Sequence, residues 1–408
     1  IILERGEEAE KRQKTVENFW KNGVLDPESN VQFGEGGAGT FSDGKLNTLV
    51  KDPYGRNHEV LKRFVAAGAP EEIIYQQKPH LGTDVLVGIV EKMRHEIEEM
   101  GGKFCFRSKV TDLIFENNTL KEIEINNDKR IPAQVCVLAP GHSARDTFEM
   151  LQKRGVYMEP KSFAVGLRIE HPQEMINMDL YGEPENELLG AASYKVTHKC
   201  ANGRGVYSFC MCPGGYVVNA SSEEHRLAVN GMSYHDRSGE NANSAVVVTV
   251  TPDDFGSDHP LAGISFQRSL EEKAYQAGQG KVPVQRFGDF KEDQITTSYG
   301  MVHSCMKGAS VFGDVRGIFP EEIAQSLEDG ITAMDHKIHG FADNDALLSG
   351  VESRTSSPVR IERDENFVCA SCDWIYPCGE GAGYAGGITS AAMDGMKVAE
   401  AIIQKYKS

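Results

Sequence analysis

Two cysteines two residues apart are the clearest candidates for reactive side chains in this sequence. Cys210 and Cys212 lie in VYSFCMCPGG, whose pattern predicts a strand, and alternate side chains on a strand share a face. We therefore expect Ser208, Cys210 and Cys212 on one face and a buried Tyr207 on the other. The two thiols could form a redox pair or contact a ligand. They could also be small buried apolar residues, as free cysteines often are.

A second pair, Cys369 and Cys372, has the CxxC spacing. It lies just before a predicted strand and not at the start of a helix, so the context of a thioredoxin-like redox motif is missing. A zinc site would need two more ligands at suitable spacing, and the sequence shows none. We interpret this pair as packing residues and predict no metal site.

Glycine-rich segments form a second kind of candidate site, because a backbone without side chains can approach a ligand closely. The GxGxxG spacing occurs twice, in GEGGAG at residues 34–39 and in GAGYAG at residues 381–386. The first match is followed by the polar TFSDGKL, so it predicts a ligand-facing loop, and Lys45 would add a positive charge there. The loop residues expected at the ligand are Gly36, Gly37, Gly39, Thr40 and Ser42.

The second glycine match follows a predicted strand and precedes a predicted helix over residues 388–406. A helix N-terminus carries unpaired N–H groups and a partial positive charge, so it could bind an anionic group of a ligand. A helix cap without a ligand is the other interpretation of these glycines.

The periodicity of apolar residues predicts the elements that would position these candidates. Helical spacing predicts helices over 83–100 and 320–338. Alternation predicts a meander of strands over about 104–125, with an Asn-Asn hairpin turn at 117–118. The apolar strand QVCVLAPG follows, and the middle of the chain is rich in strands. Helices mixed with strands in this order are typical of an α/β fold.

Composition limits the class of partner. The chain has 408 residues, with 60 acidic and 43 basic side chains, and its formal net charge is −17. This balance argues against a nucleic-acid partner, whose recognition needs clustered Lys and Arg. No apolar run approaches the ~20 residues of a membrane span, so we expect no membrane partner. Nine cysteines are too few for a disulfide scaffold in a chain of this length, so we expect a cytoplasmic protein.

Long motifs along the whole chain give it a resemblance to one family. They are NVQFGEGGAGTFSDGKL, KPHLGTD, GHSARDTFEML, FAVGLRIEHPQ, VYSFCMCPGGYVV, NGMSYHDRSGENANSA, GVESRTSSPVRI and YPCGEGAGYAGGITSAAMDG. With them the chain resembles the FAD-dependent dehydrogenases also called NAD(FAD)-utilising dehydrogenases. The resemblance implies a glutathione-reductase-like FAD-binding domain in two segments, 1–155 and 346–408. An inserted β-rich α+β domain would occupy residues 156–345.

The resemblance also implies where FAD would lie. The positions that match are Glu4 at the adenosine ribose, Val110 at the adenine, Ala139 and Gly141 in a short turn near the cofactor, Gly379 and Glu380 near the pyrophosphate and ribityl chain, and Gly386, Gly387 and Ile388 at the flavin ring. His142 follows the short turn, where it could donate a proton near the flavin or could have only a packing role.

The implied function is an FAD-dependent oxidoreductase that passes hydride or electrons through flavin to a small-molecule substrate. NADH or NADPH is the expected electron donor, and Cys210, Cys212, His142 and Lys45 are the candidate catalytic residues. Two alternatives are a flavoprotein acting on RNA, which the net charge disfavours, and a non-catalytic scaffold that has lost the cofactor. The sequence makes no prediction of oligomeric state.

The fold implied by the resemblance begins with a βα unit that carries a phosphate-binding GxGxxG, and this chain does not include that unit. Either the sequence is a fragment or the protein has lost the cofactor, and the flavin-side motifs favour a fragment. We therefore expect these 408 residues alone to bind FAD weakly, with an empty adenine–pyrophosphate groove.

Overall fold

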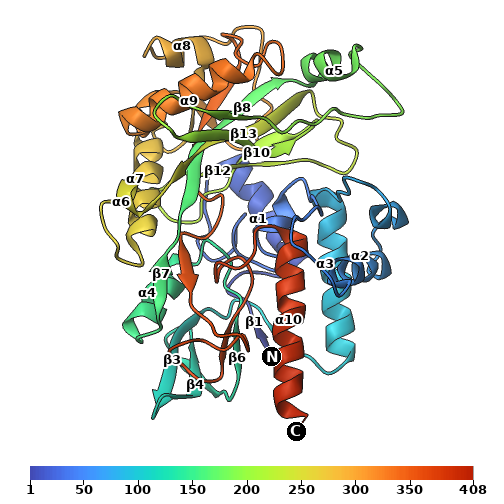
Figure 1. Ribbon diagram of the computed structural model, residues 1–408, viewed down its shortest axis with the longest axis vertical. Helices are drawn as coiled ribbons and strands as arrows, with labels where there is room; N and C mark the ends of the chain where they lie inside the picture. Colours follow the sequence, from blue (N-terminus) through green and yellow to red (C-terminus); the bar gives the residue numbers. More distant parts are fainter. Residues whose placement is uncertain (408) are drawn as a thin grey trace.

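The computed structural model describes residues 1–407, which form an upper part around a large sheet and a lower part that holds both termini (Figure 1). The fold is mixed α/β. The helices are α1 (Ala9–Asn22), α2 (Arg56–Ala66), α3 (Thr83–Glu99), α4 (Arg145–Lys153), α5 (Gln173–Tyr181), α6 (Pro252–Phe255), α7 (Ala262–Ala277), α8 (Phe287–Lys291), α9 (Glu321–Met334) and α10 (Ile388–Tyr406). Helices predicted over 83–100, 320–338 and 388–406 are confirmed as α3, α9 and α10.

The upper part contains a seven-stranded sheet in the order β15-β14-β16-β8-β13-β10-β9. Its strands are β8 (Phe163–Pro172), β9 (Thr197–Lys199), β10 (Gly205–Cys212), β13 (Asn241–Val250), β14 (Val282–Arg286), β15 (Ser310–Phe312) and β16 (Leu347–Glu352). All neighbours are antiparallel except β14 and β15. The run NSAVVVTV is rich in β-branched residues, which explains why β13 is a central strand.

The two faces of this sheet are covered differently. Leu167, Ile169 and Val246 point into a core that α9 covers with Ile323, Leu327 and other apolar residues, and α7 also packs against the sheet. The opposite face carries polar residues, and the hairpin of β11 (Tyr216–Asn219) and β12 (Val229–Met232) lies against it.

The lower part is built from short sheets and helices. β1 (Ile2–Leu3) pairs in parallel with β2 (Phe104–Cys105), and β6 (Cys136–Leu138) pairs in parallel with β18 (Ile375–Pro377). The predicted meander is confirmed as β3 (Val110–Glu116), β4 (Thr119–Ile125) and β5 (Lys129–Pro132). Asn117 and Asn118 form the predicted turn with positive φ of 50° and 61°. No helix of residues 1–407 is long and apolar enough to cross a membrane.

The C-terminal segment packs on the N-terminal one. Besides the pairing of β18 with β6, α10 contacts α2, and Gly381 packs against the carbonyl of Gly141. The chain passes between the lower and the upper part twice, after β7 (Met158–Pro160) and before β17 (Val359–Ile361). These two strands pair with each other, so the two crossings lie side by side. β16 belongs to the large sheet through pairing with β8, so it lies on the other side of the predicted boundary at residue 345.

One aromatic cluster joins the glycine loop to the β11–β12 hairpin. The indole N–H of Trp20 donates to the carbonyl of Asn219 at 2.9 Å, and the Trp20 ring meets Phe41 edge to face at 6.1 Å. Val218 and Met232 complete this cluster. The loop at residues 34–45 therefore packs, through Phe41, against the hairpin of the upper part.

Candidate functional site

A buried arginine holds the first glycine loop together. The Arg12 guanidinium donates to the main-chain carbonyls of Asn30, Val31, Gly34, Glu35 and Gly37 at 2.7–3.3 Å. Burial lowers the pKa of Arg12 to about 10, so the side chain stays charged at neutral pH. A Cβ on Gly34 would lie 2.3 Å from Cδ of Arg12, so the close approach requires glycine. Sequence reasoning missed Arg12, although it shares a helical stripe with Ala9, Val16 and Phe19.

Glu4 lies at the start of the same loop. Its Oε1 accepts the N–H of Gly6 at 2.8 Å and the N–H of Gly34 at 3.0 Å. In this structure the carboxylate therefore holds the backbone of Gly34, the first residue of the glycine loop. Its role at a ribose stays a prediction. Val110 pairs with Ile125 at the start of β3, and its contact with adenine also stays a prediction.

The glycine loop meets the N-terminus of α10. A Cβ on Gly39 would lie 3.0 Å from Cγ1 of Ile388. The Thr389 hydroxyl donates to the carbonyl of Leu46 at 2.8 Å. Thr40, in the same loop, has a buried hydroxyl with no partner among the described residues. Two segments far apart in sequence thus form one wall.

Four glycines along this wall face open space. A Cβ on Gly37, Gly141, Gly386 or Gly387 would meet no atom within 4 Å. Gly387 precedes α10 with a φ of 107° that suits glycine, and its N–H is hydrogen-bonded to the Glu380 carboxylate. The first N–H groups of this 19-residue helix have no partner within the helix, and the open space beside Gly386 and Gly387 would let a flat ligand approach them. These features fit the flavin that the resemblance implies.

Glu380 lies in the turn that connects β18 to this wall. Burial raises the pKa of its carboxyl to about 7, and the Gly387 N–H and the charge of Lys161 only partly oppose this. Gly379, with a φ of 73°, donates its N–H to Asp394 at 2.8 Å. Glu380 can therefore be neutral or charged near neutral pH and can donate or accept a hydrogen bond.

The predicted faces of β10 are wrong. Ser208 pairs with Val246 on the helix-covered face, whereas Cys212 pairs with Asn243 on the opposite face. The register shifts between Phe209 and Cys212, and Cys210 has a left-handed φ of 43°, so a β-bulge breaks the alternation. Cys210 is exposed and Cys212 is buried.

Tyr207 is half-buried, where we expected it to be buried. Its ring packs with Phe209 against Ala245 and Val247 on the face that carries the polar residues. This face is only partly covered by the β11–β12 hairpin, which explains the remaining exposure.

Two cations hold the bulge in place. Arg168 donates to the carbonyl of Cys210 at 2.9 Å and pairs with the buried Glu352 at 2.8 Å. The Lys45 ammonium donates to the carbonyl of Met211 and lies 3.5 Å from Asp43. The structure thus brings Lys45 of the glycine loop next to the cysteine strand.

Neither thiol of β10 is activated. Burial raises the pKa of Cys210 to about 12 and also raises the pKa of Cys212, so both are protonated at neutral pH. The thiol of Cys212 donates to the carbonyl of Cys210 at 3.2 Å and not to its sulfur. The catalytic roles of both residues stay predictions.

His142 is half-buried beside the exposed Gly141 and Ala139. Its Nδ1 lies 2.8 Å from the Ser143 hydroxyl. Burial, then the charges of Arg354 and Arg145, lower the pKa of His142 to about 4. The imidazole is therefore neutral at neutral pH, which disfavours the role of proton donor.

The CxxC pair is buried in the lower core. The Ser371 hydroxyl lies 3.5 Å from the sulfur of Cys369 and 3.8 Å from that of Cys372. The hydrogen bond from Cys372 lowers the pKa of Cys369 to about 6. Among residues 1–407 no group of three or more His, Cys, Asp and Glu side chains is placed to hold a metal ion.

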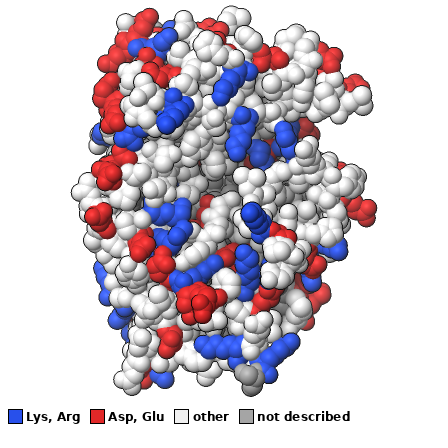
Figure 2. All heavy atoms as spheres, in the orientation of Figure 1, with Lys and Arg blue, Asp and Glu red and all other residues white. Residues whose placement is uncertain are grey.

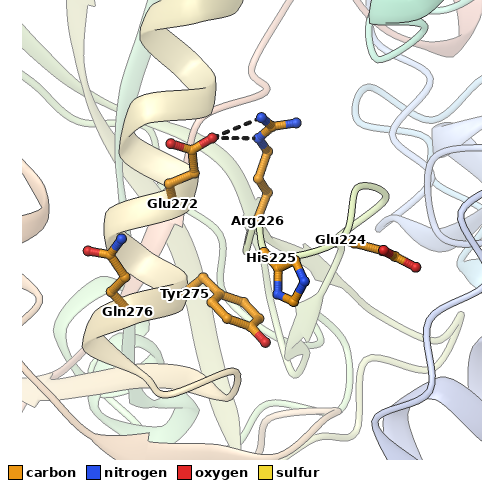
Figure 3. Close-up of a pocket in the computed structure, with 6 residues that line it drawn as sticks. All are labelled: Glu224, His225, Arg226, Glu272, Tyr275 and Gln276. Atoms are coloured by element: carbon orange, nitrogen blue, oxygen red, sulfur yellow. Dashed lines mark hydrogen bonds and ion pairs between the residues drawn. The ribbon is translucent and has the colours of Figure 1, made fainter.

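The surface is hollowed between the upper and lower parts, with Lys and Arg side chains around the hollow (Figure 2). A separate pocket of about 420 Å³ lies between α7 and residues 224–226 (Figure 3). There Arg226 pairs with Glu272 at 2.8 Å, and the His225 and Tyr275 rings meet edge to face at 5.3 Å. No residue that the sequence analysis singled out lines this pocket.

Comparison with known proteins identifies the family. Residues 162–355 match the family model described as "FAD-dependent protein, C-terminal domain-like". A protein of Clostridium beijerinckii (strain ATCC 51743 / NCIMB 8052), described as an uncharacterized protein, is 50% identical over 410 residues. The match covers 100% of this chain and 76% of that protein. The chain belongs to the same family as this Clostridium beijerinckii protein. The family model extends from β8 through β16, which again places β16 with the upper part.

Solved structures similar to this member of the family include three flavoenzymes or oxidoreductases. An oxidoreductase from Methanosarcina mazei has a TM-score of 0.30 and 12% identity, covering 77% of this chain and 54% of that one. Glycine oxidase from Bacillus cereus ATCC 14579 has a TM-score of 0.30 and 10% identity, covering 81% and 58%. CmlS, a flavin-dependent halogenase, has a TM-score of 0.34 and 12% identity, covering 82% and 41%. The chain spans about half the length of these structures, and likeness this distant supports no argument about function.

Proposed function

We propose that the protein is an FAD-dependent oxidoreductase that passes hydride or electrons between flavin and a small-molecule substrate. The observation that carries this proposal is the open N-terminus of α10, with Gly37, Gly386 and Gly387 facing free space in front of it. The match of residues 162–355 to an FAD-dependent protein family supports the choice of cofactor. The lower part would be a glutathione-reductase-like FAD-binding domain.

Different residues of the glycine loop and of the start of α10 would contact different parts of the cofactor. The N–H groups at the start of α10 would stabilise negative charge on the flavin ring. Glu380 would hydrogen-bond hydroxyl groups, because its carboxyl can donate as well as accept near neutral pH. FAD, when bound, would supply the hydride or electron transfer.

The substrate would approach the exposed face of β10. Cys210 offers a protonated thiol there, and Lys45 brings a positive charge to the same bulge. A positive charge beside reduced flavin or an anionic substrate is favourable. NADH or NADPH is the proposed electron donor. The buried Asp43, bound by Arg237 at 2.6 Å and near Lys45, would keep the Lys45 side chain in place.

The absorbance spectrum of the full-length protein tests this proposal. We expect flavin bands from co-purified or added FAD and loss of those bands when NADH or NADPH is added without oxygen. A protein that binds FAD but is not reduced by either nucleotide would reject the proposed donor. A colourless protein that binds no added FAD would reject the function.

A further inference from the structure

Three polar side chains form a relay from the protein interior to the short turn after β6. Gln32 precedes the glycine loop, and Ser143 and His142 follow β6. Gln32 and Ser143 are buried, with 6% and 4% of their surface exposed. The Ser143 hydroxyl lies 3.1 Å from Oε1 of Gln32 and 2.8 Å from Nδ1 of His142.

The partners of the relay decide which atom carries each proton. The carbonyl of Ala220 can only accept, so the atom of Gln32 that faces it at 3.2 Å is the amide nitrogen. Oε1 of Gln32 then faces Ser143 and can also only accept, so the single hydroxyl proton of Ser143 points to Gln32. The Ser143 oxygen must therefore accept from His142, and the proton of the neutral ring lies on Nδ1.

The surroundings keep His142 from taking a second proton. Arg145 and Arg354 both bind the buried Glu271, and Arg145 also lies 3.4 Å from Glu223. Burial and these two cations hold the pKa of His142 at about 4. Nε2 is thus an acceptor at neutral pH. This atom has no hydrogen-bond partner among residues 1–407 and is not fully enclosed by protein, so it is in contact with solvent.

Position and charge together indicate what Nε2 would bind. His142 follows Gly141, and a Cβ on Gly381 would lie 2.4 Å from the carbonyl of Gly141, so the ring lies beside the turn that carries Glu380. The two guanidiniums that lower the pKa of His142 would also disfavour an ammonium donor there. We propose that Nε2 of His142 accepts a hydrogen bond from a hydroxyl group of a ligand beside the turn that carries Glu380. Gln32 is the positioning residue that fixes the required tautomer of His142. The inference rests on the proposed function only for the identity of that ligand.

Nitrogen NMR of the full-length protein with ¹⁵N-labelled histidine tests the tautomer without any ligand. We expect a neutral His142 protonated on Nδ1, with its signals assigned by their absence in His142→Gln. In Gln32→Leu the Ser143 hydroxyl is free to donate to Nδ1, so the ring proton should move to Nε2. Ser143→Ala tests the same relay if Gln32→Leu fails to fold, and Gln134→Leu, at an exposed glutamine, is the control. Protonation on Nε2 in the unmodified protein would overturn the relay.

Added FAD, and then glycerol added to the FAD-loaded protein, distinguish the two sources of the hydroxyl. A change of the Nε2 resonance with FAD assigns the hydroxyl to the cofactor, and a change only with glycerol assigns it to a substrate alcohol. In the first case His142→Leu should weaken FAD binding about fivefold to tenfold, and His142→Gln should retain most of the affinity. No change with either compound would overturn the ligand contact. If FAD does not bind at all, the proposed function fails while the ligand-free tautomer measurement still decides the relay.

Discussion

His171 couples stability to pH through one unpaired nitrogen. Its Nε2 donates to the carbonyl of Phe341 at 2.8 Å, and its buried Nδ1 has no partner, so burial lowers the pKa to about 4. Between pH 6.5 and 4 the unfolded chain binds a proton that the folded protein does not. The free energy of unfolding should therefore fall as pH falls in this window, by at most ~1.4 kcal/mol per pH unit from this group.

Urea unfolding at several pH values between 6.5 and 4.5 checks this prediction. His171→Gln keeps a donor for Phe341 but does not titrate, so its stability should depend less on pH than that of the unmodified protein. Identical pH dependence in the two proteins would contradict the prediction.

Cys210 is predicted to act in turnover and not in folding. Because its side chain is exposed, Cys210→Ser should change the free energy of unfolding by less than ~0.5 kcal/mol and leave flavin content unchanged. Reoxidation of the reduced flavin by its acceptor should be slower, as followed by absorbance after rapid mixing. Cys105→Ser, at a half-buried cysteine on β2, is the control, and equal rates in the two variants would leave Cys210 without a catalytic role.

The roles of single residues could be predicted from the sequence only in part. The glycines and Lys45 could be found because their residue types are unusual in such a run. The bulge at Cys210 could not be found, because no Gly, Pro or Asn in SFCMC marks a break in alternation. Arg12 gains its role only from carbonyls 18 to 25 residues away.

Among the elements, the start of α10 is predicted to contribute to FAD affinity. Gly386→Val would place a side chain in the open space before the helix, so FAD affinity of the full-length protein should fall at least tenfold. Gly205→Val is the matched control, because Gly205 also faces open space without a positive φ, at the start of β10. Fluorescence titration with FAD gives both affinities. Equal affinities would remove this helix from the proposed site.

The glycine loop should depend on α1 through Arg12. Arg12→Met leaves several buried carbonyls without a donor, and the free energy of unfolding should fall by ~3 kcal/mol or more. Lys11→Met on the same helix, whose side chain is 66% exposed, should change it by less than ~0.5 kcal/mol. Urea unfolding measures both values, and a similar small effect of the two substitutions would show that the loop does not need the guanidinium.

Long helices could be predicted because their apolar spacing is local. α3, α9 and α10 each bury one stripe, which the sequence displays directly. β16 was assigned to the wrong side of the boundary at residue 345 because its segment, LLSGVE, pairs with β8 about 180 residues earlier. Such a long-range pairing leaves no trace in the local pattern.

For the whole molecule, one buried ion cluster joins the two parts. Arg145 of the lower part and Arg354 near the second crossing both bind Glu271 on α7, at 2.7 and 2.9 Å. These two cations hold the pKa of Glu271 far below its usual value despite burial, so the carboxylate stays charged down to acidic pH. Glu271→Gln removes the buried carboxylate that both guanidiniums bind and leaves Glu223, 3.4 Å from Arg145, as the remaining counter-charge, so it should lower the free energy of unfolding by ~3 kcal/mol.

The adjacent Glu272 supplies a matched control for this substitution. Its side chain is 47% exposed in a surface pair with Arg226, so Glu272→Gln should change the free energy of unfolding by less than ~1 kcal/mol. Urea unfolding measures both variants. Equal effects would mean that the cluster does not hold the two parts together.

The position of Trp20 gives the molecule a built-in optical reporter. The chain contains two tryptophans, and the indole of Trp20 bridges Phe41 of the glycine loop and the hairpin carbonyl of Asn219. Its emission should therefore respond when the loop rearranges around a bound molecule, whatever that molecule is. The other indole, Trp374, lies under the Lys405 ammonium near the C-terminus, so replacing it with phenylalanine would isolate the Trp20 emission. Ligands could then be screened by intrinsic fluorescence, without knowing the reaction beforehand.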